Sequence, residues 1–301
     1  MNKLTVFTPT YNRGYIIGKL YESLLKQTVH DFEWLVIDDG STDNTKDIIT
    51  KMMNEDCPFL IRYYFVENGG KQRAINEAVK IIDSEYVFIV DSDDILVNTT
   101  IEKILLWIND SDLDDTFAGV SGLKGDMDKR PLKGIPSFQG DYIDCTNLQR
   151  KQFNLSADMA EVYKTKILKQ YPFVVWPNEK FVPEALVWDA RAEDGYKLRW
   201  HKDVIYLCSY LDDGLTKGSW KLLRDNPMGY ARLFEHNANL SNNKRAKLKN
   251  IMQMDSCLIL AKELKYLRKS NNSFYGLILL PFGYLLSCRR KKQFIKYINN
   301  I

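Results

Sequence analysis

The sequence has few of the residues that mark a disulfide framework, a zinc site or a membrane span. Its five cysteines are scattered without a CxxC pair, and only three histidines occur among 301 residues. These counts exclude a disulfide-rich scaffold and a Cys/His zinc site. The apolar run over residues 274–288 contains two glycines and a proline, and it is shorter than the roughly twenty residues that cross a bilayer. We therefore expect no transmembrane helix.

Charge of one sign is also scarce. The 42 Lys and Arg residues exceed the 39 Asp and Glu residues by only 3, far below the excess of a dedicated nucleic-acid binder, so we expect no nucleic-acid partner. The first residues lead directly into an apolar segment and lack the pattern of a secretory signal. We therefore expect a cytoplasmic protein.

What the sequence does contain is a repeated alternation of strand-like and helix-like segments. Apolar, β-branched runs predict strands, and apolar residues at helical spacing follow each run. This alternation is typical of an α/β fold with a mostly parallel sheet flanked by helices. We expect strands at 4–8, 34–37, 60–66 and 86–90, and helices at 14–26, 43–53, 72–82 and 99–109.

The second half of the chain is less regular. We expect a long loop over 125–141, helices over 160–170 and 184–194, a strand over 198–207 and helices from 219 onward. The predicted domains are 1–218, with a nucleotide-sugar half (1–95) and an acceptor half (96–218), and a helical C-terminal region, 219–301.

Each of the first four predicted strands ends in a polar loop, and in a parallel sheet these loops share one edge, where ligands bind. The fourth loop, Asp91-Ser92-Asp93-Asp94, has carboxylates at positions i and i+2 of an extended segment. Such carboxylates can hold Mg²⁺ or Mn²⁺ on a diphosphate. Taken alone, the same residues are also compatible with a solvated cap.

The other three loops help to decide between a metal site and a solvated cap. They read Thr8-Pro9-Thr10-Tyr11-Asn12-Arg13, Asp38-Asp39-Gly40-Ser41-Thr42-Asp43 and Asn68-Gly69-Gly70-Lys71. In this order, together with the acidic loop, they resemble the family 2 glycosyltransferases of the GT-A fold. The resemblance is close over residues 3–95 and looser to about residue 207.

The resemblance implies a donor site for a nucleotide-sugar. Asp39 and the first loop would hold the base, typically uracil; Lys71 would face the diphosphate, Asp91 the ribose, and Asp93 would bind Mn²⁺ or Mg²⁺. The second loop alone also fits a β-turn followed by a helix cap, and Lys71 alone fits a solvated surface lysine. The full nucleotide-sugar set is Thr8, Pro9, Tyr11, Arg13, Asp39, Lys71, Asp91 and Ser92.

Inverting transfer needs a base for the acceptor hydroxyl. The family places an acidic residue at the start of a helix in the second half, which here matches Glu184 after Pro183, with Asp189 as the second candidate. The family more often has a Glu-Asp pair at this point. A first-turn glutamate also simply complements the helix dipole.

Three further features of the second half have two interpretations each. Asp158 and Glu161 would contact acceptor hydroxyls or cap a helix. His201 would be structural or would face the diphosphate or metal. The segment 210–216 would close over the donor or form a turn.

At the C-terminal end, the apolar residues 274–288 are followed by Arg289-Arg290-Lys291-Lys292. This pattern favours in-plane attachment to an anionic membrane. The alternative is a helical hairpin packed on the domain with a solvated basic tail.

Together these features predict an inverting, metal-dependent hexosyl- or N-acetylhexosaminyltransferase. It would use a UDP-sugar and act on a lipid-linked or growing surface-polysaccharide acceptor, such as capsule or exopolysaccharide, at the inner face of the plasma membrane. Two alternatives are a nucleotidyltransferase, which the absence of a GxGTR-type loop argues against, and a non-catalytic membrane-attached scaffold.

Overall fold

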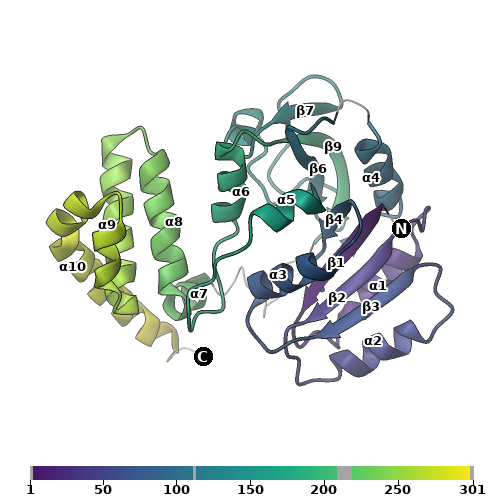
Figure 1. Cartoon of the computed structure of the whole chain (residues 1–301), viewed down its shortest axis with the longest axis horizontal. Coiled ribbons are helices and arrows are strands. Elements are labelled where there is room, and N and C mark those ends of the chain that lie inside the picture. The colour runs from purple at the N-terminus through teal and green to yellow at the C-terminus, as the bar shows by residue number, and fades with distance from the viewer. Residues whose placement is uncertain (1–2, 111–112, 209–218, 299–301) are drawn as a thin grey trace. The chain divides into compact units, whose positions relative to one another are not determined.

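The computed structural model describes residues 3–110, 113–208 and 219–298 (Figure 1). The chain divides into two compact units: Met1–Phe173 with Val187–Ser209, and Val174–Leu186 with Tyr210–Ile301. The segment Val174–Leu186 thus groups with the C-terminal helices. The predicted boundary after residue 218 and the predicted closing loop 210–216 involve residues outside the described ranges.

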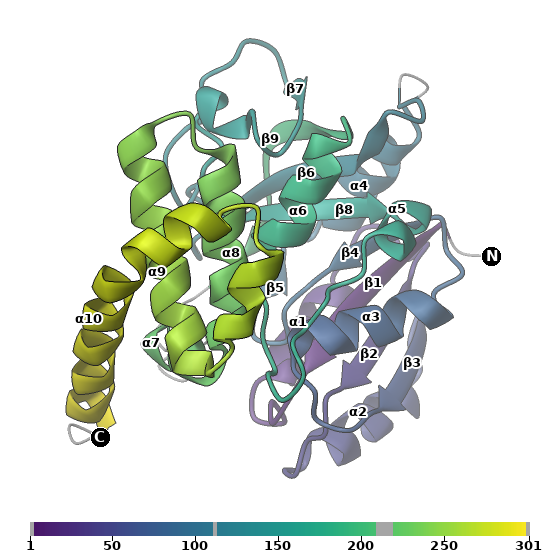
Figure 2. The same cartoon turned by 60° about the vertical axis from the view of Figure 1, so that its left-hand side comes forward.

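The first unit is built on a nine-stranded sheet, part of which is seen face-on in Figure 2. Its order is β3-β2-β1-β4-β8-β6-β9-β5, and β7 also pairs with β9. β1 to β4 are mutually parallel, whereas β8 runs antiparallel to both β4 and β6. The strands are β1 (Leu4–Thr10), β2 (Glu33–Asp38), β3 (Leu60–Phe65), β4 (Tyr86–Ile89), β5 (Ile95–Leu96), β6 (Phe117–Gly125), β7 (Tyr142–Cys145), β8 (Met159–Lys164) and β9 (Lys197–Leu207).

Helices cover both faces of this sheet. Buried side chains of α1, α2 and α4 pack with alternate residues of the central strands to form the main core, while α3, α5 and α6 lie on the other face (Figure 1). Central strands buried on both faces explain the continuous apolar runs of β1, β2 and β4. The helices are α1 (Ile17–Leu25), α2 (Thr45–Met53), α3 (Lys71–Ile81), α4 (Thr100–Ile108), α5 (Thr165–Gln170) and α6 (Ala185–Glu193), with the 3₁₀ turn η1 (Arg150–Phe153).

The prediction of one helix over 160–170 is wrong in its first part. Residues Met159–Lys164 form β8, and only Thr165–Gln170 are helical. Ala160 and Val162 point into the main core, and β8 hydrogen-bonds with β4 on one side and β6 on the other. Pairing on both edges with strands distant in sequence outweighs the local helical pattern.

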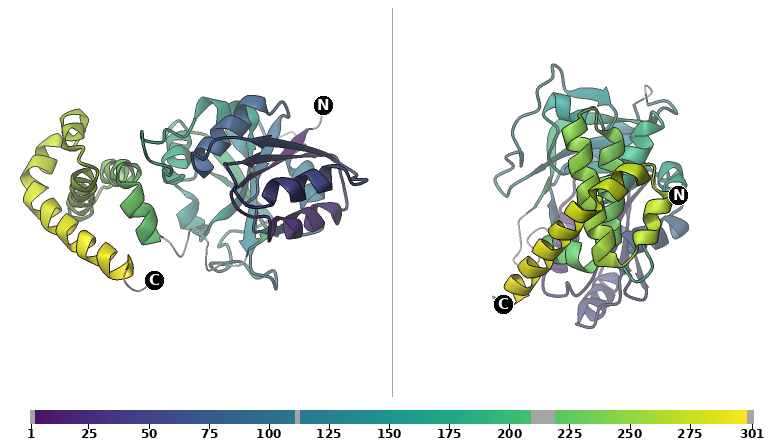
Figure 3. Two further views of the ribbon diagram at one scale, coloured as in Figure 1. Left: turned by 90° about the horizontal axis from the view of Figure 1, so that it is seen from below. Right: turned by 90° about the vertical axis from the view of Figure 1, so that its left-hand side faces the viewer.

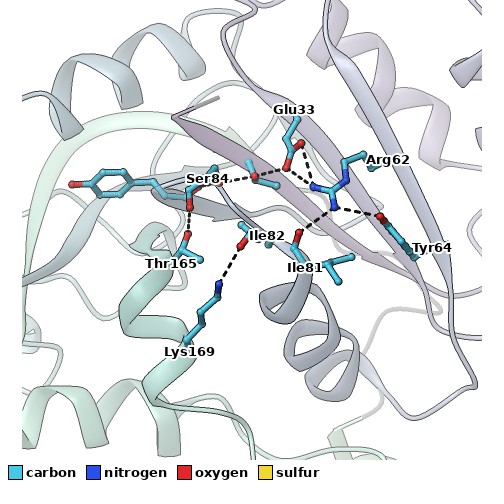
Figure 4. Close-up of polar contacts among 10 residues, drawn as sticks. Glu33, Arg62, Tyr64, Ile81, Ile82, Ser84, Thr165 and Lys169 are labelled. Atoms are coloured by element: carbon cyan, nitrogen blue, oxygen red, sulfur yellow. Dashed lines mark hydrogen bonds and ion pairs between the residues drawn. The ribbon is translucent and has the colours of Figure 1, made fainter. Parts of the chain in front are cut away.

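At the amino ends of the strands, polar side chains pair with one another (Figure 4). Arg62 on β3 forms an ion pair with Glu33 on β2 at 3.1 Å, and the hydroxyl of Thr165 donates to the carbonyl of Ser84 at 2.7 Å. This edge is therefore closed by internal contacts. The loops singled out in the sequence lie at the opposite edge, at the carboxyl ends of the strands, as predicted.

The second unit is helical. α9 packs against both α8 and α10 and lies between them (Figure 3). Met228, Ile251, Met254 and Leu258 are fully buried in its core. None of the helices within the described ranges is both long enough and apolar enough to cross a membrane. The elements are α7 (Ser219–Asp225), α8 (Pro227–Leu240), α9 (Lys244–Ala261), the 3₁₀ turn η2 (Leu264–Lys269) and α10 (Ser273–Ile298).

Candidate active site

The loops that follow β1 and β2 are tied together by hydrogen bonds. The backbone N–H of Asn12 donates to the hydroxyl of Ser41 at 2.8 Å, and the side-chain oxygen of Asn12 accepts from the N–H of Thr42 at 2.8 Å. The side chain of Tyr11, the residue before Asn12, remains about half exposed. The pairing holds Tyr11 and Arg13 on a fixed backbone at the carboxyl edge of the sheet.

Thr8 and Pro9 contribute differently to this loop. Both are buried, and the hydroxyl of Thr8 accepts a hydrogen bond from the indole N–H of Trp34 at 3.0 Å. The side chain of Thr8 therefore serves the core, and the residue as a whole is buried within β1.

Asp39 joins the second loop to the third. Its carboxylate accepts hydrogen bonds from the N–H groups of Gly69 at 2.7 Å and Gly70 at 2.8 Å. Gly70 has φ of +93° and directly precedes α3, a conformation that favours glycine. The side-chain amide of Asn68 also donates to this carboxylate, at 3.3 Å, so Asp39 is held to the third loop by both backbone and side-chain donors.

The acidic loop after β4 is built around a buried tyrosine. The hydroxyl of Tyr206 accepts from the N–H of Asp91 at 2.9 Å and donates to the carboxylate of Asp94 at 2.7 Å. Tyr206 lies on β9, far from the acidic loop along the chain. Ser92, within the loop, is buried. The loop therefore has a defined conformation set by the core.

Two lysines flank Asp91. Lys71, the first residue of α3, lies 2.7 Å from one carboxylate oxygen, and Lys124 on β6 lies 4.0 Å from the other. Lys124 also lies over the ring of Tyr206, 4.2 Å from its centroid. Burial acts to raise the pKa of Asp91, but the two lysines together lower it. Asp91 is therefore held as an anion.

Asp93 and Asp94 have the opposite shift. Burial, and then the negative charge of Asp91, raise the pKa of Asp93, and the same two causes raise that of Asp94 to about 7. Asp94 bonds to Tyr206, whereas no side chain in the described part of the chain forms a hydrogen bond or ion pair with Asp93. An unpaired carboxylate beside other carboxylates is a position that a cation would stabilise.

The described ranges contain no cluster of three or more His, Cys, Asp and Glu side chains that could enclose a metal ion. Mg²⁺ and similar ions are commonly bound by one or two carboxylates, with substrate phosphates and water completing the shell. The acidic loop fits a divalent ion of that kind, and Asp93 is the residue that could serve as its protein ligand.

Of the two candidate bases, Glu184 directly precedes α6 and belongs to the segment Val174–Leu186 of the second unit. The N-terminus of α8 holds this segment: the carboxylate of Glu179 accepts from the N–H groups of Met228 at 2.6 Å and Gly229 at 2.9 Å. The side chain of Asn226 accepts from the N–H groups of Lys180 and Phe181 at 2.8 and 2.9 Å. These hydrogen bonds anchor residues 179–181 and so fix the backbone that leads to Glu184.

Asp189, the second candidate base, lies within α6 and accepts a hydrogen bond from the side chain of Asn147 at 2.6 Å. Its carboxylate is thereby tied to the loop that leads into η1. The two candidate bases are held in place differently. Glu184 is positioned through the backbone of its segment, and Asp189 through a hydrogen bond to its side chain.

The predicted acceptor residues lie on a strand and not at a helix cap. Asp158 is exposed just before β8, and Glu161 is half-buried within β8. Beside Glu161, the guanidinium of Arg191 is sandwiched between the rings of Tyr163 and Trp188, at 3.9 and 4.0 Å from their centroids. The interpretation of Asp158 and Glu161 as a helix cap is therefore wrong.

His201 is a buried core residue. Its ring stacks on Trp107 with centroids 3.9 Å apart, and burial lowers its pKa to about 4. It is neutral at physiological pH. Of the two interpretations of His201, the structure supports the structural one.

Two residues of the acidic loop's surroundings, Lys124 and Tyr206, escaped the sequence analysis. Both come from strands of the second half and reach the loop only through sheet pairing. A lysine at the carboxyl end of a strand was the available signal for Lys124, and no local signal marks Tyr206.

Comparison with known proteins identifies the family of this chain. The model of glycosyl transferase family 2 matches residues 5–167, more than half of the chain. The chain belongs to the family 2 glycosyltransferases. All four loops, the acidic loop among them, lie within the matched residues, whereas Glu184 and Asp189 lie outside them.

Among curated family members, the chain is 29% identical over 189 residues to the poly(ribitol-phosphate) β-N-acetylglucosaminyltransferase TarS of Staphylococcus aureus, covering 62% of this chain and 30% of that protein. It is 26% identical over 267 residues to a GalNAc(5)-diNAcBac-PP-undecaprenol β-1,3-glucosyltransferase of Campylobacter jejuni, covering 82% and 79%. The chain spans about a third of the length of the first curated relatives that it matches.

Solved structures share the GT-A fold. Residues 1–349 of S. aureus TarS in complex with UDP-GlcNAc match with a TM-score of 0.58 at 18% identity, covering 97% of this chain and 92% of that one. The mannosyltransferase PcManGT from Pyrobaculum calidifontis, in complex with GDP-Man and Mn²⁺, matches with a TM-score of 0.56 at 17% identity, covering 97% and 82%. At these identities the likeness establishes the fold of this family member.

Proposed function

We propose that this chain is a metal-dependent, inverting glycosyltransferase that transfers a hexosyl or N-acetylhexosaminyl group from a UDP-sugar to an acceptor hydroxyl. The observation that carries the proposal is the acidic loop, where Asp91 is held ionised between two lysines and Asp93 is left unpaired. Family membership and the names of the relatives that use GlcNAc or glucose support the reaction class.

The donor would lie along the carboxyl edge of the sheet. The ring of Tyr11 offers a stacking face and Asp39 an acceptor for the imide N–H of uracil. Asp91 and the buried Ser92 would contact the ribose, and Arg13, whose charge acts on Asp93, would stand beside the diphosphate. Lys71 adds a cation at the first turn of α3, where helix N–H groups also favour anions.

Asp93 would hold Mn²⁺ or Mg²⁺. A bound divalent ion stabilises the negative charge that develops on a departing diphosphate. Lys71 and Lys124 would add positive charge beside the departing diphosphate, because both lie at the carboxyl edge of the sheet, where this leaving group would form. Tyr206 keeps the carboxylates in place by bonding to the loop at two points.

The acceptor hydroxyl needs a base on the face of the sugar opposite the leaving group. Glu184 would remove the proton, with Asp189 as the alternative. Asp158, just before β8, and Glu161, within β8, would contact acceptor hydroxyls. Attack on the anomeric carbon with loss of the nucleoside diphosphate inverts its configuration.

The acceptor would be a glycan or a lipid-linked precursor of a surface polysaccharide, such as capsule or exopolysaccharide. One relative is named for an undecaprenol-linked acceptor, and another for a poly(ribitol-phosphate) acceptor. An acceptor carried by a lipid would bring the enzyme to the inner face of the plasma membrane as a peripheral protein.

The test is transfer from a panel of UDP-sugars in the presence of Mn²⁺, with detection of released UDP and of the anomeric configuration of the product. Glu184→Gln should keep donor binding and lose transfer by about 10²-fold or more, while Glu193→Gln, an exposed residue at the end of the same helix, should be neutral. If the Glu184→Gln variant keeps full transfer and the Asp189→Asn variant loses transfer, the base is Asp189 and not Glu184. Retained configuration would contradict inversion.

A further inference from the structure

The outer face of α10 is an apolar surface that no described residue covers. Glycines on its inner face allow close packing on η2 and α9: a Cβ on Gly276 would come within 2.7 Å of Leu267 in η2, and one on Gly283 within 2.6 Å of Asp255 in α9. Arg290 also faces inward and donates to the hydroxyl of Ser256 at 3.0 Å. One side of α10 is therefore fixed against the unit, and the other side faces outward.

The outward side of the first turns is apolar throughout. Its large side chains are between 46% and 69% exposed. They recur at intervals of three and four residues, so they share one face of the helix over roughly 16 Å of its axis. We call this the α10 apolar face; it consists of Phe274, Tyr275, Leu277, Ile278, Phe282, Tyr284 and Leu285.

The same stripe becomes basic after Leu285. Arg289, Lys292 and Lys296 continue the helical spacing of the apolar residues and are exposed, as is Lys291. These four residues form the α10 basic end. An apolar face with aromatic residues, followed by cations on the same side, is the pattern of a helix that lies in a membrane interface.

The charge of the whole unit agrees with this pattern. The unit that contains α10 has 18 Lys and Arg residues against 8 Asp and Glu residues, a net charge of +10, whereas the other unit has a net charge of −7. A second copy of this chain is the poorer occupant of the face, because pairing through α10 would bring together two units that each carry a net charge of +10. An anionic surface complements both parts of the stripe.

We infer that the α10 apolar face and the α10 basic end form a docking surface for a bilayer of anionic phospholipid. The apolar side chains enter the boundary between headgroups and acyl chains, and the cations contact lipid phosphates. This inference deepens the proposed peripheral membrane contact and specifies the residues that make it. It does not depend on the chemistry of transfer.

The test is co-flotation of the full chain with vesicles of phosphatidylcholine, with and without phosphatidylglycerol. The wild type should bind the vesicles with phosphatidylglycerol, more weakly as salt rises. Phe282→Ser/Leu285→Ser should reduce binding about tenfold or more, and Lys291→Glu/Lys292→Glu should do so on anionic vesicles. Leu60→Ser is the matched control, because Leu60 is a similarly exposed leucine on β3 (58%, against 64% for Leu285).

Two results would overturn the inference. One is wild-type binding that the Phe282→Ser/Leu285→Ser variant retains in full. The other is a wild-type dimer, measured by light scattering, that ignores vesicles and becomes monomeric in that variant, which would make the face an interface between copies. UDP binding measured on the same samples reports on the proposed function separately, because vesicle binding is measured without donor or acceptor.

Discussion

Tyr206 holds the acidic loop by two hydrogen bonds from a fully buried position, so its hydroxyl couples the core to Asp91 and Asp94, on either side of the candidate metal ligand Asp93. Tyr206→Phe should cost about 1–3 kcal/mol of stability, because the N–H of Asp91 and the carboxylate of Asp94 lose a buried partner. It should also weaken UDP binding in the presence of Mn²⁺. Thermal denaturation and calorimetric titration measure the two effects.

Tyr266→Phe is the control for this prediction, since the hydroxyl of Tyr266 donates to Glu235 in the helical unit at 2.7 Å. It should lose stability and keep UDP binding. Equal UDP affinity in Tyr206→Phe and the wild type would contradict the role given to Tyr206.

Asp255 is a second buried carboxyl, in α9, and neither of its oxygens has a hydrogen-bond partner within the described ranges. Burial raises its pKa to about 7. A carboxyl that binds its proton more tightly in the folded state stabilises the fold at low pH, and this stabilisation is lost as pH rises from about 4 to about 7. Asp255→Asn should therefore be more stable than the wild type at pH 8, by up to about 4 kcal/mol.

At pH 4 the two proteins should differ much less, because Asp255 is then protonated in the folded state and in about half of the unfolded chains. Denaturant unfolding at both pH values checks this. The same stability difference at pH 4 and pH 8 would show that the charge of Asp255 is not the cause.

At the scale of elements, the N-terminus of α8 acts on the segment that carries Glu184. Glu179 accepts two N–H groups of α8, and its pKa is raised by burial against the lowering effect of those bonds. Glu179→Gln should lower kcat about tenfold, because the backbone before Glu184 loses its anchor, while UDP affinity stays unchanged. Steady-state kinetics and UDP titration separate these quantities.

A positioning role predicts non-additivity. In a Glu184→Gln background, Glu179→Gln should cause little further loss of transfer, because the group it positions is already absent. Glu235→Gln, which loses contacts elsewhere on α8, should reduce stability and leave kcat unchanged. An equal fall in kcat for Glu179→Gln in both backgrounds would contradict the positioning role.

How far the sequence predicts these elements depends on whether their signals are local. The strands and helices up to Asp94 were predicted because each strand is a largely apolar or β-branched run, with Arg62 inside β3, that ends in a polar loop. β8 was missed because Ala160, Tyr163 and Ile167 also fit a helical spacing of i, i+3 and i+7, and only pairing with β4 and β6 decides between the two. Lys124 and Tyr206 were missed for the same reason, since they approach Asp91 through the sheet and not along the chain.

At the scale of the whole molecule, the two units carry opposite net charge. The acidic unit holds the four loops and the carboxylates that a cation would neutralise. The basic unit carries the segment before α6 and the outward face of α10. The charge patterning was visible in the sequence only as a basic cluster near the end, because the grouping of Val174–Leu186 with the C-terminal helices is a property of the fold.

The donor and metal site is tested most directly by calorimetric titration of the full chain with UDP, GDP, CDP and ADP, with and without Mn²⁺. We expect that UDP binds most tightly and that Mn²⁺ strengthens this binding. Asp93→Asn should remove the effect of Mn²⁺, while Asp31→Asn, which changes an exposed carboxylate with no contact to the loop, should keep it. Absence of binding by every nucleotide, or an Mn²⁺ effect that survives Asp93→Asn, would contradict the assignment of the acidic loop as the donor and metal site.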